Sequence, residues 1–186
     1  MSIEGKVILG IDPGTRVLGY GVINVNKGSL KLIDSGIIDL RRIDNSYEKL
    51  RTIFQEVNNL IRLHQPNEMS IEAPFFGKNV QSMLKLGRAQ GIAIASAINN
   101  GIPIFEYAPK MIKQAISGKG SASKEQVAAL VSAILKLGYI PHNLDTTDAI
   151  AAAITHAFQF SPVQSVKKVG TSWESYLKQN PQRLKK

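Results

Sequence analysis

The fold is organised around one segment, Val7-Ile-Leu-Gly-Ile-Asp-Pro-Gly-Thr-Arg-Val-Leu-Gly-Tyr-Gly-Val-Ile23. Its aliphatic run, residues 7–11, is typical of a strand that is buried on both faces at the centre of a sheet. Asp12 ends the run, and Pro13-Gly14 predicts a tight turn, because proline fixes φ and glycine permits a positive φ. A second strand over residues 17–25 should complete a hairpin. Asp12 then stands at the carboxyl end of a central strand, although Asp-Pro-Gly taken alone is most simply a turn.

Length and composition favour one globular domain without disulfides. The chain has 186 residues, 44% of them apolar, which is enough for a core and too many for a disordered chain. It has no cysteine, which excludes disulfides, thiolate metal sites and thiol nucleophiles. The N-terminus lacks a signal-peptide pattern, and the apolar stretch 91–98 is too short to span a bilayer. We therefore expect a cytoplasmic protein.

The charge balance is strongly basic. Lysine and arginine number 23 against 14 acids, a net charge of +9. This balance favours a polyanionic partner, nucleic acid before an anionic membrane, with a generally basic protein as the alternative. Residues 161–186 carry six of the basic residues against Glu174 alone. We expect residues 1–160 to form the domain and residues 161–186 a basic, flexible tail.

Hydrophobic periodicity places the remaining elements. Further strands are expected at residues 30–40, 69–73 and 102–107, the last at an edge because it contains a proline. Helices are expected at residues 46–65, 80–99 and 110–116, from residue 123, and at residues 144–160. Gly36 inside the third strand indicates a bulge or a close approach. The small residues of helix 80–99 indicate tight packing or a subunit interface.

Three more carboxylates occupy positions that a site could use. Glu72 ends the fourth strand, and Asp145 and Asp148 project from one face of the first turn of the last helix. Acids at a helix N-terminus also stabilise its dipole, which is the simpler alternative. However, the apolar residues after Asp148 predict buried surroundings, and a buried carboxylate needs a partner. That segment offers no lysine or arginine, which favours a metal ion.

Four acids gathered in a basic protein repel one another unless cations lie between them. Oxygen-only ligands select Mg²⁺ or Mn²⁺. Two such ions about 4 Å apart can activate water and stabilise the leaving oxygen of a phosphodiester. The basic surface would then hold the nucleic acid backbone around the site.

The chain resembles the RuvC family of Holliday-junction resolvases over roughly residues 6–160. The matching segments are Gly10-Ile-Asp-Pro-Gly-Thr-Arg, Gly19-Tyr-Gly-Val, Ile71-Glu72, residues 75–79, Leu84-Lys-Leu-Gly87, Phe105-Glu-Tyr107, Gly118-Lys-Gly-Ser-Ala122 and Asp145-Thr-Thr-Asp148-Ala. The resemblance implies an α/β, ribonuclease-H-like fold, a mixed five-stranded sheet flanked by helices. It also implies that Asp12, Glu72, Asp145 and Asp148 are the catalytic, metal-binding acids. The implied reaction is symmetric, metal-dependent cutting of four-way junctions during recombination and repair.

The resemblance further implies how DNA is held. An aromatic three residues after the glutamate stacks on bases, which here is Phe75, with Phe76 beside it as the alternative. Lys113 and Lys124 match basic residues outside the metal site, and Lys119 is a third candidate. A solvated surface position is the plain alternative for each lysine.

The family works as a homodimer and is associated with a branch-migration complex, so both partners are expected here. Helix 80–99 is a candidate for the dimer surface. His142 is expected in a surface loop, with a ligand or proton-transfer role as the alternative, and His64 and His156 are expected to be structural. Competing functions are a non-catalytic junction-binding relative and a ribonuclease-H-type nuclease. An actin-like ATPase would need a second lobe, for which 186 residues leave no room.

Overall fold

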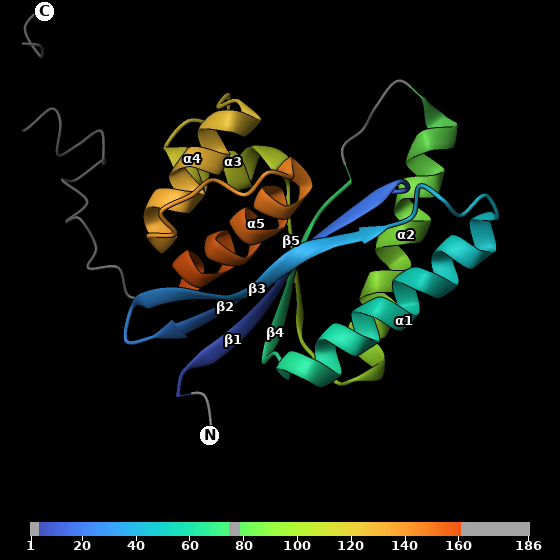
Figure 1. The fold of residues 1–186 in the computed structure, drawn as a ribbon, viewed down its shortest axis with the longest axis horizontal. Helices are drawn as coiled ribbons and strands as arrows, with labels where there is room; N and C mark the ends of the chain where they lie inside the picture. Colours follow the sequence, from blue (N-terminus) through green and yellow to red (C-terminus); the bar gives the residue numbers. More distant parts are fainter. Residues whose placement is uncertain (1–3, 75–78, 161–186) are drawn as a thin grey trace, which may run out of the picture.

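The computed structural model describes residues 4–74 and 79–160, in which a sheet is covered by helices on both faces (Figure 1). The strands are β1 (Lys6–Asp12), β2 (Val17–Asn26), β3 (Ser29–Asp39), β4 (Glu68–Glu72) and β5 (Ile104–Tyr107). The helices are α1 (Ser46–His64), α2 (Val80–Asn99), α3 (Pro109–Ser117), α4 (Lys124–Leu135) and α5 (Leu144–Phe160). Each element therefore lies where the sequence predicts it, within a few residues at its ends.

The strand order is β3-β2-β1-β4-β5, so the aliphatic run of β1 is central, as predicted. Strands β1, β2 and β3 form an antiparallel meander, and β4 and β5 run parallel to β1 and to each other. Strand β5, which Pro103 precedes, lies at an edge of the sheet, as predicted. This mixed five-stranded sheet, flanked by helices, confirms the ribonuclease-H-like fold.

Alternation along β1 divides its side chains between two cores. Val7, Leu9 and Ile11 pack into the core beneath α1 and α2, whereas Ile8 packs into the core with α3, α4 and α5. Because successive side chains of a strand point to opposite faces, Asp12 lies on the same face as Ile8, toward α5. The strand that anchors the fold thus also aims its terminal carboxylate at the last helix.

Helix α5 lies almost directly on the backbone of the β1–β2 hairpin. A Cβ at Gly10 would come within 2.1 Å of the Ala149 carbonyl oxygen, and one at Gly19 within 2.0 Å of the Asp145 carbonyl oxygen. Contacts this short leave no room for a side chain at either position unless the helix moves. Two glycines of the hairpin therefore set how closely the start of α5 approaches the sheet.

Gly36 marks a close approach rather than a bulge. It pairs with Tyr20, and a Cβ at Gly36 would lie 2.8 Å from the Tyr20 hydroxyl. The register shift between β2 and β3 falls elsewhere, between Val22 and Ile23. Of the two alternatives left open by the sequence, the structure supports the close approach.

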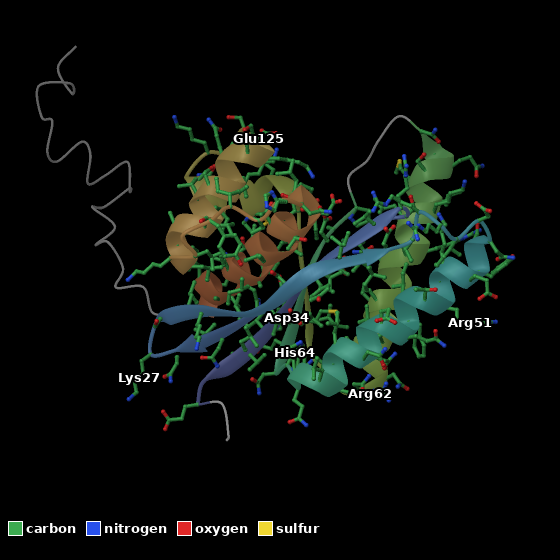
Figure 2. The ribbon with its side chains drawn as sticks, in the orientation of Figure 1. Lys27, Asp34, Arg51, Arg62, His64 and Glu125 are labelled. Atoms are coloured by element: carbon green, nitrogen blue, oxygen red, sulfur yellow. The ribbon has the colours of Figure 1, made fainter. Side chains whose placement is uncertain are left out.

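The helix ends follow local capping rules. The Asn45 side chain accepts hydrogen bonds at the start of α1, and Gln65 ends that helix in the left-handed conformation, just before Pro66. Figure 2 shows His64 beside Asp34, and their side chains are 2.9 Å apart, which ties the end of α1 to β3. None of the helices within the described ranges combines the length and the apolar character of a membrane span.

Candidate active site

Three of the four predicted acids meet at one edge of the sheet. Asp12 comes from the end of β1, and Asp145 and Asp148 come from the first turn of α5. One carboxylate oxygen from each residue lies within 4.8 Å of the others, which is a spacing that one metal ion could bridge. Because residues three apart share a face of a helix, both aspartates of α5 can point at Asp12.

Glu72 joins this cluster from the neighbouring strand, although it is not within the 4.8 Å group. It ends β4, which runs parallel to β1, so the carboxyl ends of the two strands lie at the same edge. On the same face of β4, the Ser70 hydroxyl donates to the Ala152 carbonyl of α5 at 2.7 Å. Since Ser70 and Glu72 are two residues apart, Glu72 also projects toward α5.

The acids change one another's ionisation. Burial, together with the charges of Glu72, Asp148 and Asp145, raises the pKa of Asp12 to about 8, against the opposing charge of Lys124. Burial likewise raises the pKa of Glu72 to about 7, together with the charge of Asp148. Two carboxyls that would be protonated near neutral pH mark a site that lacks enough positive charge for its acids.

Lys124 is the cation nearest to these acids. Its ammonium forms an ion pair with the Asp148 carboxylate, whose side chain is only 13% exposed. Burial opposes the charge of Lys124, but the hydrogen bond to Asp148 and the charges of Asp148, Asp12 and Asp145 outweigh it and raise the pKa. The segment around Asp148 offers no lysine or arginine, but Lys124 reaches it from α4, 24 residues earlier in the chain, so a metal ion is not the only cation available to Asp148.

The other two lysines differ in their relation to the site. Lys113 of α3 is partly buried, and its charge lowers the pKa of Glu72, which places it on the acidic side of the molecule. Lys119 is exposed in the loop between α3 and α4, where its carbonyl oxygen accepts a hydrogen bond from Ser117 at 2.8 Å. The structure thus groups Lys113 and Lys124 with the acids.

Of the remaining candidate residues, the structure describes the three histidines but not the two phenylalanines. His142 is exposed in the loop before α5, as expected for a surface residue. His64 pairs with Asp34, and His156 is fully buried, which fits their expected structural roles. Phe75 and Phe76 lie outside the described residues, as does the tail 161–186.

Comparison with known proteins agrees with this geometry. Residues 8–156 match the model of the family described as crossover junction endodeoxyribonuclease RuvC. A protein of that name from Cytophaga hutchinsonii is 53% identical over 180 residues, which are 97% of this chain and 88% of the relative. Another from Bacteroides fragilis is 50% identical over 186 residues, with 98% of both chains covered.

A solved structure also matches the same family. The structure of Thermus thermophilus RuvC in complex with a Holliday junction substrate superposes with a TM-score of 0.74. That protein is 31% identical, and the match covers 82% of this chain and 93% of the other. From the family match, the near-complete coverage of its relatives and the shared fold, we conclude that the chain belongs to the RuvC family of crossover junction endodeoxyribonucleases.

Proposed function

We propose that the protein resolves four-way DNA junctions by metal-dependent hydrolysis of phosphodiester bonds, with Asp12, Glu72, Asp145 and Asp148 as its catalytic acids. The observation that carries this proposal is the meeting of three of these acids within 4.8 Å at one sheet edge. The raised pKa values of Asp12 and Glu72 support it, because a bound cation would restore the ionised form of both groups. Membership of an endodeoxyribonuclease family indicates that the reaction is hydrolysis of phosphodiester bonds in DNA.

The donor set fits a hard divalent ion. Only carboxylate oxygens are offered, which suits Mg²⁺, or Mn²⁺ as a substitute, with two ions as the proposed stoichiometry. When bound, such ions would activate water and stabilise the leaving oxygen of the phosphodiester. The protein's part is to hold the carboxylates in place through β1, β4 and the first turn of α5. Lys124, now paired with Asp148, would be free to contact a DNA phosphate once a metal ion takes its place.

DNA contacts outside the metal site form the next part of the proposal. Lys113 and Lys124 would contact backbone phosphates beside the acids, and Lys119 would do so from the adjoining loop. Phe75, three residues after Glu72, would stack on a base at the junction. These roles agree with the basic character of the chain, since phosphate contacts supply most of the affinity of DNA-binding proteins.

A homodimer would let two sites nick two strands symmetrically, and α2 is the proposed contact surface. Its outer face carries Val80, Leu84 and Ile98, each more than half exposed. Gly87 and Gly91 face open space, where an added Cβ would meet no atom within 4 Å. Their smallness is not needed for packing within the described chain, which is consistent with the approach of a second backbone. A cytoplasmic location and contact with a branch-migration complex complete the proposal.

The decisive experiment offers three substrates to the purified protein. A labelled four-way junction, a linear duplex and an RNA–DNA hybrid are each incubated with Mg²⁺ or with a chelator. We expect paired, symmetric nicks in the junction alone and only with metal. Binding without cutting would instead indicate a non-catalytic relative, and cutting of the hybrid would indicate a ribonuclease-H-type substrate.

A further inference from the structure

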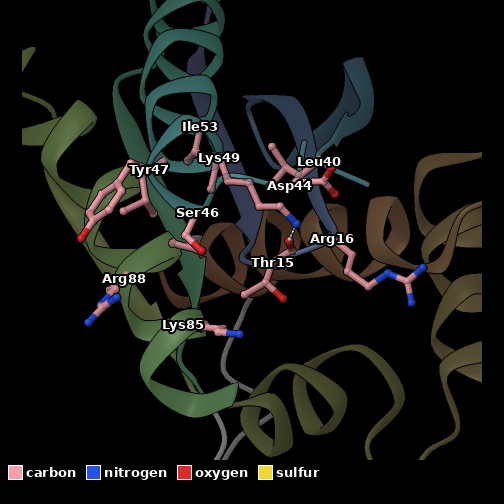
Figure 3. Close-up of a pocket in the computed structure, with 12 residues that line it drawn as sticks. Thr15, Arg16, Leu40, Asp44, Ser46, Tyr47, Lys49, Ile53, Lys85 and Arg88 are labelled. Carbon is pink, nitrogen blue, oxygen red and sulfur yellow. Dashed lines mark hydrogen bonds between the residues drawn. The ribbon is translucent and has the colours of Figure 1, made fainter. Parts of the chain in front are cut away.

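A cavity of about 520 Å³ opens between the β1–β2 turn, the start of α1 and the first half of α2 (Figure 3). None of the four acids lines it, so it is distinct from the candidate active site. Its volume falls within the range of roughly 300–1,000 Å³ that is typical of small-molecule sites, which is ample for a nucleotide.

Two kinds of side chain line this cavity. Its floor is apolar and belongs to the core, with Leu40, Ile53 and Ala89 all buried. Its walls carry four cations and one acid, which are Arg16, Lys49, Lys85, Arg88 and Asp44. Within the described chain, none of these four cations takes part in an ion pair. An apolar floor with uncompensated positive walls suits a ligand that combines a flat or apolar body with negative charge.

Two of the cations approach one point from different elements. The Lys49 ammonium donates to the Thr15 carbonyl oxygen at 3.1 Å, and Figure 3 shows Lys85 reaching toward Thr15 from α2. Arg16 and Arg88 lie on either side of this point. Tyr47, which also lines the cavity, is 77% exposed, so its aromatic ring is accessible to a ligand. Aromatic rings beside cations are the usual means of holding unpaired bases and their phosphates.

The cavity also lies close to the acids along the chain. Thr15 is three residues after Asp12, and a chain of that length spans at most about 11 Å. That reach corresponds to roughly three base steps of a duplex, at about 3.4 Å of helix axis per step. One DNA strand could therefore occupy both sites at once.

We propose that this cavity, bounded by Thr15, Lys49 and Lys85, binds the sugar-phosphate backbone of a junction strand within a few nucleotides of the scissile bond. The phosphates contact the cations, and a sugar or an unpaired base rests on the apolar floor and against Tyr47. The inference rests on the proposed function, since it assumes that the acids act on a junction strand. It adds a second anchor, on the opposite face of the sheet from α5.

The absence of cysteine allows a direct test by cross-linking. Ser46→Cys places one thiol on the cavity wall, and Ser29→Cys places one at the exposed start of β3 as a matched control. Each full-length variant is mixed, with chelator, with four-way junctions that carry a bromoacetyl group on one phosphorothioate near the cut site. We expect cross-links to residue 46 from one to three consecutive phosphates, and none above background to residue 29.

Affinity gives a second test that needs no modified DNA. Junction binding is measured across salt concentrations for Lys85→Gln, Arg16→Gln and the charge-matched control Arg62→Gln. Arg62 is exposed in the last turn of α1, far from the cavity (Figure 2). Each loss of a phosphate contact should lower the slope of log affinity against log salt by about 1 and weaken binding about tenfold, whereas Arg62→Gln should leave the slope unchanged.

The outcomes separate this inference from the proposed function. If the wild-type protein cuts the junction but residue 46 gives no cross-link and both cavity variants behave like Arg62→Gln, the second anchor is wrong and the resolvase stands. If the wild-type protein does not cut any junction, the proposed function itself fails. Sedimentation of each variant shows whether it still forms the dimer. If Lys85→Gln alters the dimer, because Lys85 lies on α2, Arg16→Gln still tests the cavity, because Arg16 lies in the β1–β2 turn.

Discussion

Helix α5 carries ionisable side chains at both of its ends, and each end meets the same face of the sheet. At its start, Asp145 and Asp148 face Asp12, so like charges gather with Lys124 as the nearby cation. Toward its far end, His156 lies between the Tyr107 hydroxyl at 2.7 Å and the Glu68 carboxylate at 2.6 Å.

The two ends therefore differ in how their charges are balanced. Glu68 also pairs with Lys6, and these hydrogen bonds to Lys6 and His156 hold its pKa below the usual range, against the effect of burial. Asp12 instead has a pKa raised to about 8. A satisfied network stabilises the fold, whereas a concentration of like charge lowers stability and creates a demand for an external cation. The first end is the region expected to do chemistry, and the second is expected to hold the helix.

Of the variants that test this difference between the two ends of α5, Asp12→Asn should have the largest effect. We expect junction cutting to fall at least about 1000-fold, because an amide cannot replace the carboxylate at the centre of the acid cluster. Without metal at pH 8, the same change should raise the stability of the protein by about 1–2 kcal/mol, since it removes a repelled charge. Single-turnover cleavage and thermal unfolding measure the two effects. Glu56→Gln, an exposed acid on α1, is the control, and wild-type cutting by Asp12→Asn would refute the metal site.

Gly19→Ala should displace the acidic end of α5 alone. Its Cβ would lie 2.0 Å from the Asp145 carbonyl oxygen, so the first turn of α5 must move away from Asp12. A shift of about 1 Å should reduce cutting about 100-fold, because catalysis depends on precise placement of the carboxylates. Cleavage kinetics at a temperature where circular dichroism shows the folded state would test this. Wild-type rates in a folded variant would mean that α5 does not position the acids.

His156→Leu should affect stability and not chemistry. It removes a fully buried ring that bonds both Tyr107 and Glu68, so we expect a loss of about 2–3 kcal/mol in the free energy of unfolding. Tyr107→Phe removes one of these bonds and should cost about 1 kcal/mol. Urea unfolding measures both losses. A large fall in the cutting rate of the folded His156→Leu protein would contradict the division between the two ends.

Stability should respond to pH in opposite directions at the two ends of α5. Because the folded pKa of Asp12 is raised, its contribution to stability is present at low pH and is lost as pH rises toward 8. Burial lowers the pKa of His156 despite its bond to Glu68, so stability there is lost as pH falls below about 6.5. Urea unfolding with chelator from pH 5 to 9 should therefore show a maximum in between.

Metal should reverse the alkaline loss. Added Mg²⁺ should restore stability above pH 7, because its binding requires the ionised carboxylates. In Asp12→Asn both the alkaline loss and the restoration should shrink. A stability curve that is unchanged by Mg²⁺ at every pH would argue against a metal site formed by these acids.

Much of the molecule follows from local pattern. The aliphatic run of β1, the capping box at Ser123 and the hydrophobic period of α1 predict their elements because each depends on neighbours in sequence. The four acids were identifiable because each stands at the end of a strand or the start of a helix. The sequence shows that Gly10 and Gly19 stand in the first hairpin, but it does not show that α5 packs against both of them.

Contacts between distant segments could be found only in the folded chain. The ion pair of Lys124 with Asp148 joins α4 to α5, and a search for partners within one segment could not find it. The raised pKa of Asp12 needs burial and three acids from two other elements, which no local pattern reports. The cationic cavity likewise unites the β1–β2 turn with α1 and α2. Sequence specifies local conformation and the chemistry of each side chain, while charge coupling and cavities arise only when packing brings remote residues together.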